Sequence, residues 1–349
     1  MGGFRDFPTM GAYVTIRARL FQETNMIRMV VALIAAALGA LGAPSFAQEW
    51  PSKSIRIISP FAPGGGSDTL GRILAGHLSE KLGKQFLIEN RGGAGGIVGT
   101  AVAAKADPDG YTFVISSIAT HVIAPATNPN TGYDSLRSFS HVAYIGGPPT
   151  VIVVHPSLGV TTFKELVTLV KSGAPPLAYG SPGPGTLGNL LAEFWAQKEN
   201  VKLSHISYKG AGQAVGDLVA GHVKMGSVTL TAVLGQLRAG VLIPLAVSSA
   251  NRLAEFPNVP TLRELGYPDL VAITWFAIAA PAGVPNAIVQ RMNQEIIKAI
   301  DNPAVRQRFN AEEIESEKMS PEELTRFVES EMAKWIPIAK MAMASHSAK

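Results

Sequence analysis

The stretch SIRIISPFAPGGGSDTLGRILAGHLSEKLG (residues 54–83) places a strand, a glycine-rich loop and a helix in direct succession. Its first eight residues are rich in isoleucine, which predicts a buried strand. Leucine or isoleucine then recurs at positions 70, 73, 74, 78 and 82, the spacing of one helix face. We expect Ser67 or Asp68 to cap the start of this helix and Gly83 to cap its end.

The same order of strand, loop and helix recurs along the chain. Strands are expected at 85–90 and 111–117, and a second glycine cluster, RGGAGG (91–96), opens a small-residue helix between them. Strands that alternate with helices favour an α/β fold with a parallel sheet covered by helices.

The pattern restarts near residue 145, which predicts two α/β units. We expect the units to be linked by strands near 145–155 and 270–280. The predicted domains are 48–148 together with 272–349, and 149–271. Three C-terminal helices are expected to pack on the first unit, near residues 286–300, 303–311 and 321–343.

The N-terminus predicts a cleaved secretory signal. Met26–Arg28 is a short basic segment, and the apolar run MVVALIAAALGALGA follows at 29–43. Ser45 and Ala47 have the spacing that a signal peptidase requires. The run is too short to span a bilayer comfortably, which disfavours the alternative of a membrane anchor. We therefore expect 1–47 to be an N-terminal extension plus signal peptide, and the mature protein to be periplasmic.

Composition narrows the classes of function. The isoelectric point is about 9.2, but no Lys/Arg cluster alternates with aromatic residues, so we expect no nucleic-acid partner. The chain has no cysteine, which excludes thiolate nucleophiles and disulfides. Its seven histidines lack metal-ligand spacing, so we expect no metal and no other cofactor.

The glycines at 64–66 indicate an anion site, because a helix N-terminus presents unpaired N–H groups. A Walker-type phosphate loop is absent, since no Lys follows the glycines at the required spacing. The dinucleotide fingerprint is closer, because Gly64 and Gly66 fit its first two glycines. Thr69 replaces the third, however, and a secreted protein rarely meets NAD.

Catalysis is an alternative that the sequence leaves open. No G-x-S-x-G elbow exists, and no histidine–aspartate pair is identifiable for Ser181 in GSPGPGT (180–186). Asp68 is a candidate base, although a helix cap is the expected role of an aspartate there. A secreted hydrolase using Ser181 or Asp68 is therefore the rival hypothesis, and a structural or adhesive protein is a third.

Loops rich in glycine or hydroxyl groups follow predicted strands four times. They carry neutral N–H, Ser and Thr donors but few cations, and they lie at residues 62–68, 90–96, 116–121 and 180–186. Ligands of open α/β sheets gather at the carboxyl ends of strands. Neutral donors there hold a carboxylate reversibly, as expected of a binding protein and not of an enzyme.

Several linked motifs resemble one family, the Bug-type periplasmic solute-binding proteins of tripartite tricarboxylate transporters. The resemblance runs from about Trp50 to Trp335 and includes FAPGGGSDTLGRILAGHLSEKLG, IENRGGAGGIVGTAVAAKADPDGYT, SPGPGTLGNLLAEFW, ISYKGAGQAVGDLVAGHV and FAIAAPAGVPNAIVQRMNQEI. It implies a two-domain Venus-flytrap fold with mixed or parallel sheets covered by helices. The cleft between the domains binds a small carboxylate, which the protein delivers to membrane transporter subunits. We expect a monomer, with a di- or tricarboxylate, an amino acid or an aromatic acid as ligand.

The resemblance also implies two loops that grip the carboxylate from opposite domains, an apolar wall just before the first loop, and polar residues at and after the third strand. Carried over by position, the candidates are Phe61, Gly65, Gly66, Ser67, Asp68, Ser116, Ser117, Thr120, His121, Ser181, Gly183, Gly185 and Thr186. His121 also fits a structural role, packing between loops. Ala124, Asn189 and Lys224 depart from the residues usual in the family, so no member's particular ligand is carried over.

Overall fold

The computed structural model describes Met26, Met29, residues 50–173 and residues 175–347. Apart from the two methionines, the predicted N-terminal extension and signal peptide at 1–47 lie outside the described residues. Residues from Pro51 onward group into one compact unit that holds two five-stranded sheets. The boundaries expected between two domains therefore stay a prediction.

The first sheet is mixed and is built mainly from the N-terminal part of the chain. Its strand order is β2 (Phe86–Asn90), β1 (Ile55–Ser59), β3 (Thr112–Ser117), β10 (Phe276–Pro281) and β4 (Phe139–Gly146). β1 runs parallel to β2 and β3, whereas β10 is antiparallel to β3 and β4. Strand β10 thus returns from the far end of the sequence to the middle of this sheet.

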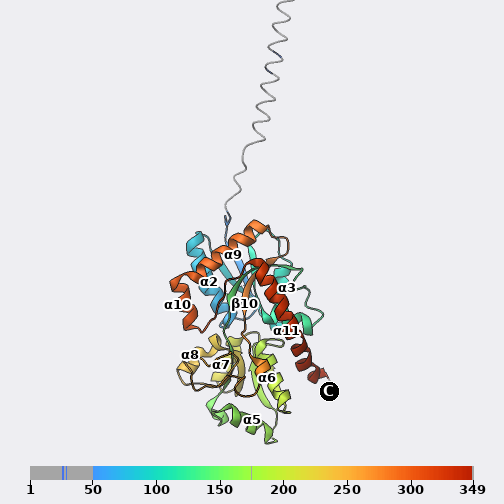
Figure 1. The fold of residues 1–349 in the computed structure, drawn as a ribbon, viewed down its shortest axis with the longest axis vertical. Helices are drawn as coiled ribbons and strands as arrows, with labels where there is room; N and C mark the ends of the chain where they lie inside the picture. The colour runs from blue at the N-terminus through green and yellow to red at the C-terminus, as the bar shows by residue number, and fades with distance from the viewer. Residues whose placement is uncertain (1–25, 27–28, 30–49, 174, 348–349) are drawn as a thin grey trace, which may run out of the picture. The chain divides into compact units, whose positions relative to one another are not determined.

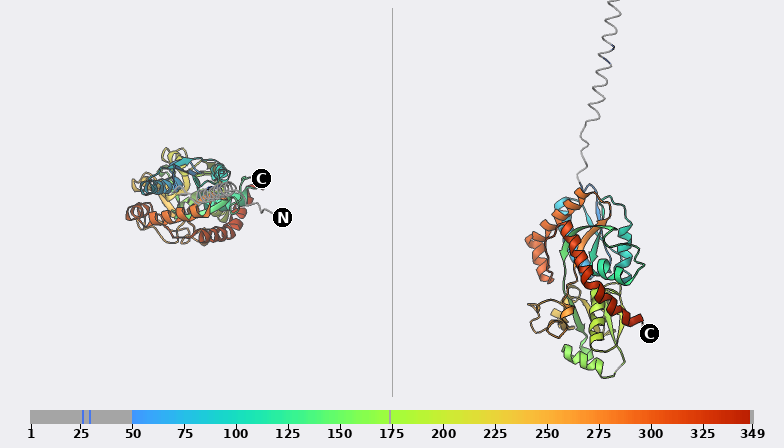
Figure 2. Two further views of the ribbon diagram at one scale, coloured as in Figure 1. Left: turned by 90° about the horizontal axis from the view of Figure 1, so that it is seen from above. Right: turned by 45° about the vertical axis from the view of Figure 1, so that its right-hand side comes forward.

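Helices surround the first sheet, as Figures 1 and 2 show. They are α2 (Gly66–Leu82), α3 (Ile97–Ala104), α9 (Asn286–Asp301), α10 (Pro303–Ala311) and α11 (Pro321–Ser347). Helices α9 and α11 contact β4, and α10 contacts α2. The C-terminal helices therefore pack around the first sheet, as predicted. Helix α11 also reaches a helix of the second sheet, α6 (Leu187–Lys198).

The second sheet repeats this plan, with two parallel pairs followed by two antiparallel pairs. Its strand order is β7 (Leu203–Ser207), β6 (Leu177–Ser181), β8 (Met225–Thr229), β5 (Thr150–Val154) and β9 (Ile243–Val247). Its helices are α5 (Phe163–Lys171), α6, α7 (Ala211–Val219) and α8 (Leu230–Arg238).

Strand β5 explains how the second sheet is buried on both faces. Ile152 and Val154 belong to the cluster that contains α5 and α6, whereas Val151 and Val153 pack with α7 and α8. Successive side chains of a strand point to opposite faces. A strand without polar alternation therefore fits only a sheet that is covered on both sides.

Two short segments connect the sheets, one between β4 and β5 and one before β10. They run side by side, because Pro149 pairs with Ile273. The remaining short elements are η1 (Ala94–Gly96), η2 (Ala119–Ile123), α4 (Ala124–Thr127), η3 (Pro156–Leu158) and η4 (Pro268–Leu270). Of these, η2 is a π-helical turn directly after β3, where the sequence suggests only a polar loop.

Candidate functional site

A pocket lies where loops of the two sheets meet. Its cavity volume is small, about 30 Å³. The residues that line it are Phe61, Gly65, Gly66, Ser67, Ser117, Ala119, Pro182, Thr186, Leu187, Gly188, Ala211, Thr229, Thr274 and Phe276. Many of them follow the carboxyl ends of strands β1, β3, β6 and β8, the position that open α/β sheets use for ligands.

Four helices point their N-termini at this pocket. Helix α2 contributes its cap Gly65, α6 contributes its cap Thr186, α7 contributes its first residue Ala211, and α8 contributes its cap Thr229. The first N–H groups of a helix have no partner within the helix, and the helix dipole is positive there. None of the lining residues is charged, so these dipoles are the electrostatic feature that the lining itself offers a ligand.

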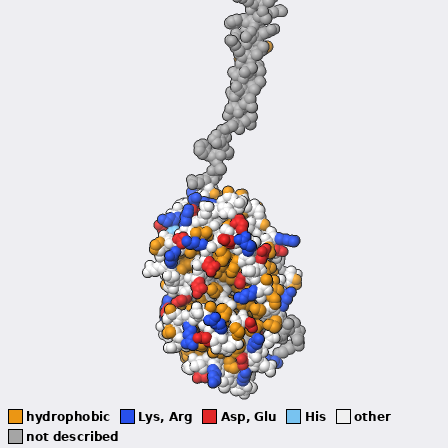
Figure 3. Space-filling view, in the orientation of Figure 1, with side chains coloured by type: hydrophobic (Ala, Val, Ile, Leu, Met, Phe, Trp, Pro, Cys, Tyr) orange, Lys and Arg blue, Asp and Glu red, His pale blue; other side chains and the backbone are white. Residues whose placement is uncertain are grey.

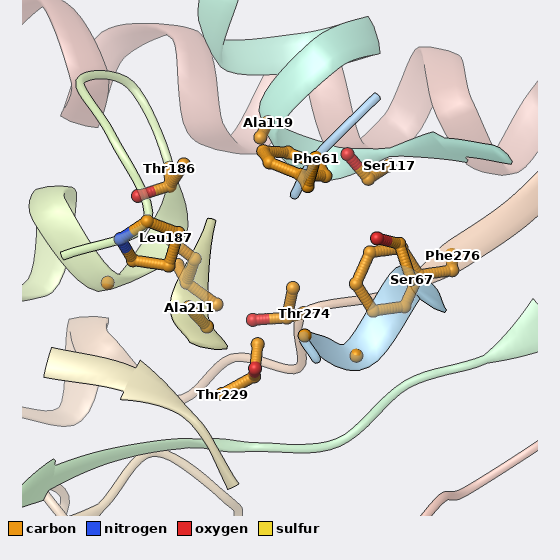
Figure 4. A pocket seen from close by; sticks show the side chains of 14 residues that line it. Phe61, Ser67, Ser117, Ala119, Thr186, Leu187, Ala211, Thr229, Thr274 and Phe276 are labelled. Atoms are coloured by element: carbon orange, nitrogen blue, oxygen red, sulfur yellow. The ribbon is translucent and has the colours of Figure 1, made fainter. Parts of the chain in front are cut away.

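Five hydroxyl side chains and two aromatic rings complete the lining, as Figure 4 shows. The Thr186 hydroxyl donates to the Gly183 carbonyl at 2.7 Å and accepts the Asn189 N–H, which fixes the start of α6. Thr229 differs, because its Oγ1 is buried and has no hydrogen-bond partner among the described residues. A buried hydroxyl without a partner is costly, and a bound ligand would satisfy it.

Asp68 does not face the pocket but holds the glycine loop in place. Its carboxylate accepts the Gly64 N–H at 3.2 Å, the Arg72 guanidinium at 3.0 Å and the Asn90 amide at 2.9 Å. Burial raises the pKa of Asp68, but these hydrogen bonds outweigh burial and hold the pKa below its usual value. An ionised, fully engaged carboxylate is poorly suited to act as a general base.

The prediction that Ser67 or Asp68 caps the start of α2 was wrong. Its N-cap residue is Gly65, without a side-chain cap, and both Ser67 and Asp68 lie inside the first turn. Asp68 instead reaches back to the Gly64 N–H, one residue before the cap. The expected end was right, because Gly83 caps the helix in the left-handed conformation.

The predicted site residues divide into two groups. Those that line the pocket are Phe61, Gly65, Gly66, Ser67, Ser117 and Thr186. Those that do not are Asp68, Ser116, Thr120, His121, Ser181, Gly183 and Gly185. The second group lies behind the first: Ser116 donates to the Ala277 carbonyl, and Gly183 anchors Thr186.

Ser181 has the partner that sequence reasoning could not identify. Its Oγ lies 2.7 Å from His205 Nε2, on the neighbouring strand β7. The serine is fully buried, does not line the pocket, and its Oγ also accepts the Gly183 N–H. A nucleophile must reach its substrate, so this pair lies in a poor position for catalysis on a ligand in the pocket.

Eight lining residues were missed by sequence reasoning. They are Ala119, Pro182, Leu187, Gly188, Ala211, Thr229, Thr274 and Phe276. Some have a local signal, because Leu187 and Gly188 follow the recognised GSPGPGT loop. Thr274 and Phe276 have none, since the antiparallel return of β10 brings them to the pocket.

Loops of the two sheets touch beside the pocket. The Ala62 N–H donates to the Lys209 carbonyl at 2.9 Å, and Gly95 packs on the carbonyl of Pro184. The second glycine cluster therefore serves close backbone packing between the sheets, although it was expected to be one of the ligand loops.

Outside the pocket, we searched the described residues for metal sites, membrane-spanning helices and charged surface patches. In the described part of the chain, no group of three or more His, Cys, Asp or Glu side chains could hold a metal ion. No helix among the described residues is both long and apolar enough to cross a membrane. On the face shown in Figure 3, basic and acidic side chains are interspersed.

Comparisons with known proteins agree with this geometry. The sequence model of TctC, described as the tripartite tricarboxylate transporter family receptor, matches residues 70–343. Protein BugT of Bordetella pertussis (strain Tohama I) is 34% identical over 318 residues, which cover 90% of this chain and 98% of BugT.

Two similar structures were solved with a dicarboxylate. An R. palustris protein solved with adipate is 32% identical, with a TM-score of 0.81 over 84% of this chain and 98% of that one. MatC from Rhodopseudomonas palustris, with bound malate, is 27% identical, with a TM-score of 0.78 over 83% of this chain and 100% of MatC.

Proposed function

Because this chain belongs to the tripartite tricarboxylate transporter receptor family, we propose that it is a periplasmic solute-binding protein for a small carboxylate. The ligand binds in the pocket between the two sheets, and the protein then delivers it to membrane subunits of a tripartite transporter. We expect no cofactor to take part, and the signal peptide within residues 1–47 directs export. The family consists of transport receptors, and two structural relatives were solved with adipate and with malate.

One observation carries the proposal of a carboxylate. Helix α2 from the first sheet and helix α6 from the second direct their N-termini into a pocket whose lining has no charged side chain. Such a site stabilises a negative charge through N–H groups and helix dipoles. Without an Arg or Lys clamp in the lining, binding stays readily reversible, as delivery to a transporter requires.

Binding between two sheets implies that the loops open and close around the ligand. The contacts of Ala62 with Lys209 and of Gly95 with Pro184 would form on closure. A ligand that touches both sheets favours the closed arrangement by its differential contacts.

Thermal melting of the purified protein against a panel of acids tests the proposal. The panel contains di- and tricarboxylates, amino acids and aromatic acids, and the uncharged amide of each acid is its control. At a hundredfold excess over Kd, a ligand stabilises the fold by about 2.7 kcal/mol, which raises Tm by several degrees. A flat response to every acid would overturn the proposal.

Delivery to a transporter needs a cellular test. Bacteria that lack this chain should take up the identified acid more slowly, and complementation should restore uptake. Normal uptake without the chain, in cells that have no second receptor for that acid, would contradict the delivery step.

The contact between Ser181 and His205 is the observation that favours a hydrolase. Ser181→Ala separates the two functions. In a binding protein, the variant still binds the acid and there is no turnover to lose. Ester or amide hydrolysis by the parent protein that disappears in this variant would establish the hydrolase instead.

A further inference from the structure

His121 is buried, does not line the pocket, and yet is connected to it by hydrogen bonds. Its Nδ1 lies 3.0 Å from Thr120 Oγ1. Thr120 Oγ1 lies 3.2 Å from Ser117 Oγ, and Ser117 lines the pocket. Two hydroxyl groups, those of Thr120 and Ser117, thus link the buried imidazole to the wall of the binding site.

The surroundings hold this chain of groups in one geometry. The Phe139 ring packs on the imidazole at a centroid distance of 4.7 Å, and Tyr133 donates its hydroxyl proton to the Thr120 carbonyl at 2.6 Å. Thr120 and His121 both belong to the π-helical turn η2, which begins two residues after β3 ends. Burial, together with the neighbouring His141, keeps the pKa of His121 well below its usual value, so the ring is neutral at neutral pH.

The positions of the protons decide whether the Ser117 hydroxyl offers a ligand a hydrogen-bond donor or only lone pairs. Thr120 Oγ1 already accepts the Ser117 N–H at 3.1 Å, and it has a single proton to donate. If His121 Nδ1 carries the imidazole proton, it donates to Thr120. Thr120 then donates to the Ser117 hydroxyl at 3.2 Å, which is nearer than its other acceptor, the Ser117 carbonyl at 3.4 Å, and the Ser117 proton is free for the pocket. If Nδ1 is bare, it accepts the Thr120 proton. Thr120 Oγ1 is then the acceptor 3.2 Å from the Ser117 hydroxyl, and a Ser117 proton directed there leaves only lone pairs for the ligand.

A carboxylate accepts hydrogen bonds and repels lone pairs, so only the first arrangement suits an anionic ligand. We propose that His121 is a positioning residue: its Nδ1–H, acting through Thr120, orients the Ser117 hydroxyl as a donor to the bound carboxylate. This inference rests on the proposed function of the pocket. It assigns His121 an indirect role, in place of the direct ligand contact expected from sequence.

A double-mutant cycle tests the coupling, with Kd for the best acid of the panel as the readout. We expect Ser117→Ala and His121→Leu each to weaken binding about fivefold to tenfold, the worth of one hydrogen bond. The double variant should bind no more weakly than Ser117→Ala alone, because the hydrogen-bond chain from His121 acts on the ligand only through the Ser117 hydroxyl. Multiplying losses would overturn the proposal, and so would a Ser117→Ala variant that binds as the parent does.

A conservative variant and a spectroscopic measurement separate positioning from packing. His121→Asn keeps an N–H donor near the Nδ1 position and should recover most of the affinity that His121→Leu loses. In the liganded parent protein, ¹⁵N NMR of the His121 ring should show the proton on Nδ1. A proton on Nε2 would overturn the proposal even if the leucine variant failed to fold.

The outcomes also distinguish this inference from the proposed function. If no acid of the panel stabilises the parent protein, the proposed function is wrong, and so is the positioning role of His121 that rests on it. If an acid binds but the cycle is additive or the Nε2 tautomer is present, only the positioning role of His121 is wrong.

Discussion

Gly95 lies directly against Pro184, across the boundary between the two sheets: a Cβ at residue 95 would stand 2.1 Å from the Pro184 carbonyl oxygen. Gly95 is in the left-handed region, with φ of 64°. Any other residue there would strain the backbone and also push the two loops apart. The glycine therefore permits the arrangement in which the loops meet beside the pocket.

Gly95→Ala should weaken carboxylate binding about tenfold or more, equivalent to at least about 1.4 kcal/mol. The reason is that the closed contact with Pro184 cannot form. Gly83→Ala is the matched control, because Gly83 has the same φ of 64° but no atom within 4 Å of the added Cβ. Both variants should lose about 1 kcal/mol of stability from backbone strain. Calorimetric titration that gives the two variants the same Kd would contradict the closure role of Gly95.

Gly66 and Gly76, which both lie in helix α2, form a second matched pair of substitutions and test whether the pocket binds the ligand. A Cβ at Gly66 would come within 2.9 Å of the Phe276 ring, whereas nothing lies within 4 Å of a Cβ at Gly76. Gly76→Ala should stabilise the protein by about 0.5–1 kcal/mol through helix propensity and leave Kd unchanged. Gly66→Ala should displace Phe276 in the pocket and weaken binding. Equal Kd values for the two variants, measured by titration, would show that Phe276 and the start of α2 do not hold the ligand.

The architecture was largely predictable from the sequence because its signals are local. Glycine clusters that follow isoleucine-rich runs mark the strand–loop–helix junctions, and α2 ends at Gly83 as expected. The first sheet is mixed because β10 enters antiparallel between β3 and β4, and the second is mixed because β5 is antiparallel to β8 and β9. A strand's direction depends on tertiary contacts, and nothing in its own sequence specifies it.

The candidate site was predictable only where it coincides with those junctions. Phe61, Gly66 and Thr186 lie at recognised loops and line the pocket. His121 and Ser181 are polar residues at the same strand ends, but they point into hydrogen bonds behind the pocket wall. Which side a hydroxyl or imidazole faces depends on the π-helical turn and on neighbouring strands, and a motif does not encode either.

Thr229 gives a prediction in which stability and affinity change in opposite directions. Its buried Oγ1 has no partner among the described residues, so Thr229→Val should leave the unliganded protein equally stable or more stable. The same change removes a hydroxyl from the lining and should weaken binding about threefold to tenfold. Thr100→Val is the control, because Thr100 donates to the Gly96 carbonyl at 2.9 Å and its loss should lower Tm. A lower Tm of unliganded Thr229→Val, comparable to that of the control, would mean that Oγ1 is already satisfied.

The buried pair of His121 and His141 makes the fold sensitive to acid. Burial lowers the pKa of His141 to about 4, whereas an unfolded histidine titrates near 6.5. As pH falls below about 6.5, the unfolded chain therefore takes up a proton that the folded chain refuses. This contribution to stability is complete above about pH 6.5 and is lost toward pH 4, at about 1.4 kcal/mol per pH unit.

His141→Leu should reduce that dependence. Denaturant unfolding between pH 8 and pH 4 should give the variant a shallower loss of stability below pH 6.5 than the parent has. Between pH 7 and pH 8 the two slopes should agree, because His141 is neutral in both the folded and the unfolded chain there. His121 remains in the variant, since burial holds its pKa low as well, so a residual slope is expected. Identical slopes below pH 6.5 would mean that His141 takes up its proton without unfolding, through an opening of the groove formed by Phe139, Val284 and Glu322 beside it.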